Sequence, residues 1–182
     1  MREFNDADRS LVTRRRLLKV DVKRELATSP AAAWAVISDH RTWPEWHEDY
    51  VEHATLTEQT MGLGTTFASR EWWKLRSESE ITHWLDGSAV GLTLRRANVW
   101  RWLITSQYNE IEVEPVGGDP SRSVVHFRAG FTGTILFWLL AGYTVGQAVG
   151  LTWINAHSSL KKLEKLLLER QNPAASGDAS AR

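Results

Sequence analysis

The chain has 182 residues, with 22 basic and 22 acidic side chains and no cysteine. This length suits one domain with a substantial core, and the balanced charge gives no reason to expect nucleic-acid binding. The lack of cysteine excludes disulfides, zinc–thiolate sites and a cysteine nucleophile, and it is typical of proteins of the reducing cytoplasm. We therefore expect one cytoplasmic domain without a nucleic-acid partner.

The chain begins with a polar, charged stretch that predicts a flexible lead over residues 1–16. After it, Leu18, Val20 and Val22 alternate with charged residues, which is the pattern of a half-buried strand. We expect this strand to run to about Ala27.

Two short helices are predicted next. Ser29-Pro30 combines a side-chain cap with proline at the first helical position, and it predicts a helix over Ala31–Ile37. Asp39 can cap a second helix over Thr42–Asp49, although Pro44 must lie in its first turn.

The middle of the chain alternates between apolar and polar residues with a period of two. This pattern predicts six strands joined by short turns, and therefore an antiparallel meander. The predicted strands are Val51–Glu58, Thr65–Trp73, Arg76–Trp84, Ala89–Arg95, Ser106–Val116 and Ser121–Phe131.

The C-terminal part predicts a long amphipathic helix. Apolar residues recur at helical spacing, so they form one stripe that must lie on an apolar surface; they are Val149, Trp153, Ala156, Leu160, Leu163 and Leu167. Since one helix over Gly133–Gln171 would be too long for a compact chain, we expect a break near Gly142.

These elements predict an α+β fold. A seven-stranded curved antiparallel sheet surrounds the long C-terminal helix, with two short helices after the first strand. The expected organisation is a lead over 1–16, one domain over 17–171 and a disordered tail over 172–182.

Five stretches resemble the START-like, or SRPBCC, superfamily, and most closely its polyketide cyclase/dehydrase and lipid-transport branch. They match the signatures of the first and second helices, two strands and the last helix, and they are Ala27–Asp39, Trp43–Trp46, Gly62–Thr65, Ser79–Trp84 and Ser158–Glu164. The resemblance implies the helix-grip fold, with a cavity between the concave sheet face and the long helix. The same fold hosts enzymes, receptors and lipid carriers, so the resemblance leaves the activity open.

Strand alternation predicts which side chains line such a cavity. The expected apolar wall consists of Phe67, Trp84, Phe127, Phe131, Tyr143 and Trp153, and its sparse polar groups are Ser69, Glu71, Gln107, Asn109 and Gln147. The same alternation sends Tyr108, Glu110, Glu112, His126 and Arg128 toward water. In the alternative interpretation these wall residues fill a solid core.

Glu71 is the one candidate for catalysis, because a carboxylate on an apolar face has a raised pKa and can act as a general acid or base. Alternatively, it is solvated or paired with Arg70 or Lys74. The histidines and acids between His40 and His53 match no zinc spacing and suggest a solvated helix face. We expect no metal and no cofactor.

Three functions remain open. The first is a binding module for a hydrophobic small molecule, such as a lipid or a polyketide-like aromatic. The second is a cyclase or dehydratase that uses the buried carboxylate. The third is a membrane-associated protein that contacts lipid through Ile135–Ala156, a run without charge that holds glycines at small-xxx-small spacing.

Overall fold

The structure is a computed structural model that describes residues 17–48, 52–56, 61–70, 76–97, 104–133 and 141–172. Its strands are β1 (Leu17–Leu26), β2 (Glu52–Thr55), β3 (Thr66–Arg70), β4 (Arg76–Leu85), β5 (Ala89–Ala97), β6 (Ile104–Val116) and β7 (Asp119–Gly133). Its helices are α2 (Pro30–Ile37), the 3-10 turn η1 (His40–Thr42), α3 (Trp43–Trp46) and α5 (Ala141–Gln171).

The strands form one antiparallel sheet in the order β1-β7-β6-β5-β4-β3-β2. The first strand therefore closes the sheet at one edge by pairing with the last. Register shifts interrupt the β4–β5 pairing after Glu78 and after Ile81. Because extra residues of this kind bend a strand and increase its twist, they help to curve the sheet toward the helices.

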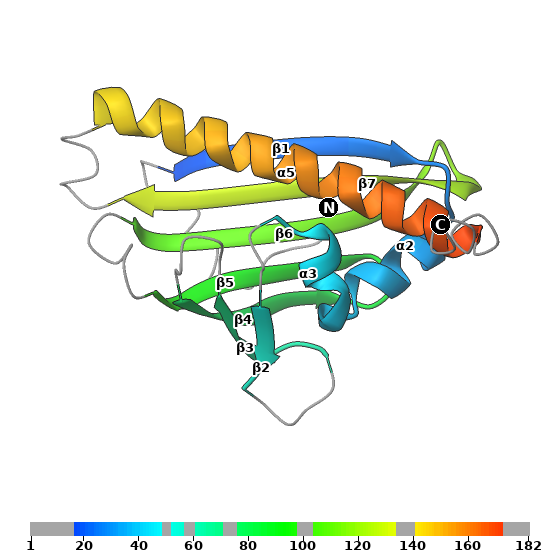
Figure 1. Cartoon of the computed structure of the whole chain (residues 1–182), viewed down its shortest axis with the longest axis horizontal. Coiled ribbons are helices and arrows are strands. Elements are labelled where there is room, and N and C mark those ends of the chain that lie inside the picture. The colour runs from blue at the N-terminus through cyan, green and yellow to red at the C-terminus, as the bar shows by residue number, and fades with distance from the viewer. Residues whose placement is uncertain are drawn as a thin grey trace, which may run out of the picture.

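Helix α2 begins where the sequence predicts. Ser29 caps it, since its Oγ accepts a hydrogen bond from the Ala32 amide at 3.2 Å, and proline follows at the first turn. The expected second helix is shorter than predicted, because it divides into η1 and α3 and ends at Trp46 instead of Asp49. Helix α2 lies over the end of the sheet where β1 finishes and β7 starts, whereas α3 lies between α5 and β2 (Figure 1).

Helix α5 runs along β1 and β7 on the same side of the sheet as α2 and α3 (Figure 1). Its first turn lies at the opposite end of the sheet from α2 (Figure 1). Four residues of the predicted stripe are buried against the core: Ala156, Leu160, Leu163 and Leu167. Val149, another residue of the stripe, is half-buried and packs against this core.

The predicted fold class is confirmed: a curved antiparallel sheet holds a long C-terminal helix, and short helices follow the first strand. Strand β1 begins at Leu17 and α5 ends at Gln171. Helix α5 begins at Ala141, and the residues directly before it, where the expected break would separate two helices, lie outside the described residues. Among the described residues, no helix is long and apolar enough to cross a membrane.

Candidate functional site

The concave face of the sheet is built from alternate residues of adjacent strands. In β7 the buried apolar positions are Val125, Phe127, Ala129 and Phe131. The β6 register pairs Gln107 with Phe131, Asn109 with Ala129 and Ile111 with Phe127, which places these side chains on the same face. The face is therefore apolar at its centre and carries two amides near the start of β6.

Hydroxyl groups extend this polar margin across β3 and β4. Ser69 pairs with Ser77, and Phe67 pairs with Ser79, so the three serines share the concave face with Phe67. All three serines are less than a tenth exposed. With Gln107 and Asn109, which are half-buried, they form a margin of uncharged hydrogen-bonding groups. We call these five residues the polar margin.

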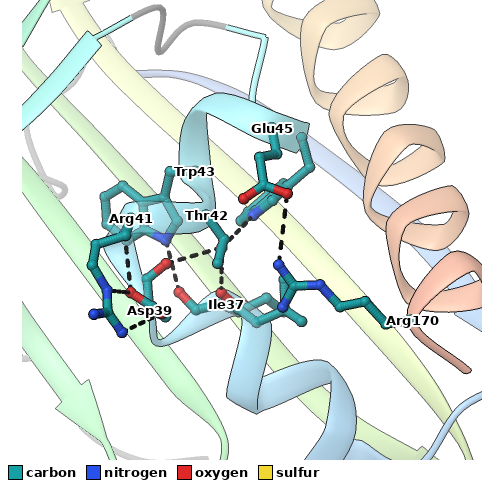
Figure 2. A network of polar contacts seen from close by, with 9 residues as sticks. Ile37, Asp39, Arg41, Thr42, Trp43, Glu45 and Arg170 are labelled. Atoms are coloured by element: carbon teal, nitrogen blue, oxygen red, sulfur yellow. Dashed lines mark hydrogen bonds and ion pairs between the residues drawn. The ribbon is translucent and has the colours of Figure 1, made fainter. Parts of the chain in front are cut away.

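The short helices are fixed in place by buried hydrogen bonds (Figure 2). The Thr42 hydroxyl bonds to the Val36 carbonyl at 2.8 Å, and the indole of Trp43 donates to the Ile37 carbonyl at 2.8 Å. Asp39 caps η1 through the Arg41 amide and also binds the Arg41 guanidinium at 2.8 Å. The Arg41 hydrogen bond lowers the pKa of Asp39 against the effect of its partial burial.

Two histidines of these helices face phenyl rings of the sheet. The ring of His40 lies 5.4 Å from that of Phe67, and the ring of His47 lies 5.4 Å from that of Phe127. His47 is 5% exposed, so the expectation of a solvated helix face is wrong for it. Burial lowers the pKa of His40, which favours a neutral imidazole that both donates and accepts hydrogen bonds. The described residues contain no group of side chains suited to hold a metal.

The two histidines were expected on a solvated helix face, because Pro44 lies between them and they match no zinc spacing. A usable signal was their position beside tryptophans: His47 follows Trp46, which is fully buried.

Polar contacts tie α3 to the second half of α5. Glu48 accepts hydrogen bonds from Ser158 and from Lys162, the latter at 2.8 Å, and its own amide donates to Ser159 at 2.9 Å. Partial burial raises the pKa of Glu48, but the Lys162 and Ser158 contacts outweigh it and lower that pKa overall. Glu45 reaches Arg170 at 3.6 Å (Figure 2).

Strand β1 is tied to the same half of α5. The Arg24 guanidinium binds Glu164, with its Nε at 2.8 Å from the carboxylate, and Gln171 donates to the Thr28 hydroxyl at 2.8 Å. These ties, with those of α3, hold the helix between Ser158 and Gln171.

The structure brings together most of the predicted wall residues that it describes. Phe67, Ser69, Phe127 and Phe131 are buried, while Trp84, Gln107 and Asn109 are half-buried. The ring of Trp84 contacts that of Trp34, with centroids 5.2 Å apart. Tyr143 and Gln147 belong to α5, but their side chains lie outside the described part, and Glu71 lies outside the described residues altogether.

Trp153 does not line the concave face as predicted, because 50% of it is exposed. Its ring stacks on the exposed His157 at 5.4 Å. Helix α5 packs mainly along β1, which is the edge strand, so the sheet covers only part of the helix surface.

The convex face is less solvated than alternation predicts. Glu110 and His126 point away from the helices as expected, but each is less than a tenth exposed. Glu110 accepts hydrogen bonds from Tyr108 and from Arg128, the latter at 2.7 Å, and Arg128 also pairs with Glu112. Alternation reveals only the face, whereas burial here depends on long side chains that cover one another.

Comparison with known proteins assigns the chain to a family. The family model described as polyketide cyclase / dehydrase and lipid transport matches residues 18–166. The chain belongs to this family. Among curated proteins, none matches this chain.

Solved structures share its fold. The protein XoxI from Bacillus cereus is 17% identical, with a TM-score of 0.66 over 84% of this chain and 97% of its own. Norcoclaurine synthase from Thalictrum flavum is 15% identical, with a TM-score of 0.63 over 84% of this chain and 87% of its own. A START superfamily protein from Mycobacterium smegmatis is 13% identical, with a TM-score of 0.56 over 87% and 99%. At these identities the likeness concerns the fold.

Proposed function

We propose that the protein binds an apolar or aromatic small molecule, lipid-like or polyketide-like, between the concave sheet face and α5. The observation that carries this proposal is the polar margin, in which uncharged amides and hydroxyls border a face otherwise made of phenyl and aliphatic groups. Small-molecule sites have this composition, with mostly apolar walls and a few groups that orient the ligand. A core that only packs against itself does not need five polar side chains on this face.

The family supports the same class of ligand, since its description names polyketide chemistry and lipid transport. Norcoclaurine synthase, which has this fold, has been crystallised with dopamine and hydroxybenzaldehyde. The uncharged margin favours an apolar or aromatic ligand with hydroxyl or carbonyl groups.

A filled-site variant tests the proposal. Ser79→Phe adds a ring on the concave face, whereas Glu78→Phe adds the same ring to the convex face of the same strand. Binding of a long-chain fatty acid and of a polyhydroxylated naphthalene is measured by tryptophan fluorescence and native mass spectrometry. We expect at least one probe to bind to the wild type and to Glu78→Phe, and Ser79→Phe to lose that binding. Absence of binding to the wild type, or equal binding to both variants, contradicts the proposal.

Enzymatic activity is the second candidate, and the two histidines favour it. On β1 and β3–β7 the described concave positions carry no carboxylate, so acid–base chemistry there would use the imidazoles of His40 and His47. Glu71 as the catalytic carboxylate stays a prediction, as does a cytoplasmic location. If His47→Gln abolishes turnover of a polyketide-like substrate while leaving its binding unchanged, the protein is an enzyme; if no substrate is turned over, it is a carrier.

A further inference from the structure

The two edges of the sheet differ in length. Strand β2 forms one edge with four residues, whereas β1 forms the other edge with ten (Figure 1). Among the described residues, β1 pairs with β7 alone, so its outer edge presents a long row of backbone donors and acceptors. Such an edge is a template for pairing with a strand of another chain.

The convex face of β1 carries charges of alternating sign. Lys19, Asp21, Lys23 and Glu25 are all exposed, because the residues between them face the helices. The first three form no ion pair within the described part of the chain. Glu25 contacts Arg122 of β7 at 2.8 Å, but both side chains remain more than half exposed. Edge charges oppose pairing where they meet like charges, whereas an alternating row can meet opposite ones.

Antiparallel pairing of β1 with a second β1 satisfies these charges in one register, which is centred on Val22. Lys19 then faces Glu25 of the second copy, and Asp21 faces its Lys23. Centring the pairing on Asp21 sets that residue opposite itself and Lys19 opposite Lys23. Centring it on Lys23 sets Lys23 opposite itself and Asp21 opposite Glu25. Because opposite charges across strands stabilise a sheet and like charges destabilise it, the charges select the Val22 register.

We propose that the outer edge of β1 binds β1 of a second copy of this chain, antiparallel and centred on Val22. The two sheets then become one continuous sheet. Backbone hydrogen bonds supply the affinity, and the alternating charges fix the partner and the register. The association rests on β1 and does not involve the proposed ligand, so failure of either proposal leaves the other standing.

Helix α5 is compatible with this arrangement. On one flank its Ser159 faces α3 through Glu48, and on the other flank its Glu164 binds Arg24 of β1. Trp153 lies about three turns before Glu164 and therefore shares the β1 flank, where it is 50% exposed. A two-fold axis at Val22 sets the two α5 helices antiparallel on the same side of the joined sheet, with these flanks toward each other. The pairing therefore covers an indole that is exposed in the single chain.

Charge reversal tests both the partner and the register. The mass of the full chain is measured by analytical ultracentrifugation, and we expect the wild type to be a dimer at roughly 100 μM. Asp21→Lys and Lys23→Glu each turn two attractive pairs into repulsive ones, so each variant should associate about tenfold more weakly or worse. An equimolar mixture of the two variants should form heterodimers, because every facing pair then joins opposite charges. Glu114→Lys is the matched control, since this exposed acid lies on β6, away from the edge.

A charge exchange keeps the proposal falsifiable if the single variants do not fold. Asp21→Lys/Lys23→Asp keeps the composition of the wild type and restores opposite pairs in the Val22 register, so it should dimerise. With the wild type it would place like charges opposite each other, so native mass spectrometry of a mixture with one isotopically labelled partner should show homodimers only. A monomeric wild type, single variants that dimerise as tightly as the wild type, or heterodimers of the wild type with the exchanged variant in statistical proportion overturn the proposal.

Discussion

The contact between α5 and the sheet is tested most directly by Leu163→Ala. Leu163 is fully buried in the central cluster, where α5 rests on the sheet. The change removes three carbons, which at about 0.8 kcal/mol per group amounts to about 2.4 kcal/mol of lost burial. The cavity that remains raises the loss of unfolding free energy to about 3–4 kcal/mol.

The measurement is urea unfolding followed by far-UV circular dichroism, together with a thermal scan. For a chain of 182 residues, this loss should lower Tm by about 6–16 °C. Leu168→Ala is the control, because Leu168 is 44% exposed and should lose about 1 kcal/mol or less. If both variants lose the same unfolding free energy, α5 does not pack on the sheet as described, and it cannot cover the proposed ligand site.

Three further predictions concern the sheet, the first helix and the clamp between helices. In Gly91→Ala a new Cβ would lie 2.6 Å from the Tyr108 hydroxyl, so the unfolding free energy measured by urea titration should fall by about 1–3 kcal/mol. Gly150 has open space around it, so Gly150→Ala should raise the unfolding free energy by about 0.5–1 kcal/mol in the same assay. Ser29→Ala removes the cap of α2 and should lose about 1 kcal/mol by urea unfolding, while Ser29→Gly should lose only a few tenths. The pKa of Glu48 is lowered in the fold, so the stability that this residue contributes is present above the ordinary glutamate pKa and is lost as pH falls through the lowered value. Glu48→Gln should therefore reduce the loss of unfolding free energy at acid pH, measured by urea unfolding at a series of pH values. An unchanged acid dependence would contradict the stabilising role of the Glu48 contacts with α5.

The arrangement of elements could be predicted from sequence because each signal is local. Alternation in β7 identified the buried face, and Ser29-Pro30 located the start of α2. The two-residue period and the helical stripe are imposed by backbone geometry, so they survive in the folded chain. These local signals were enough for the fold class.

Features that depend on distant neighbours could not be predicted. Trp153 fits the apolar stripe by spacing, but 50% of it is exposed. Glu110 fits the solvent face by alternation, but Tyr108 and Arg128 cover it. His47 is buried because Phe127, far along the chain, lies beneath it. Each error concerns where an element ends in space, which no spacing rule contains.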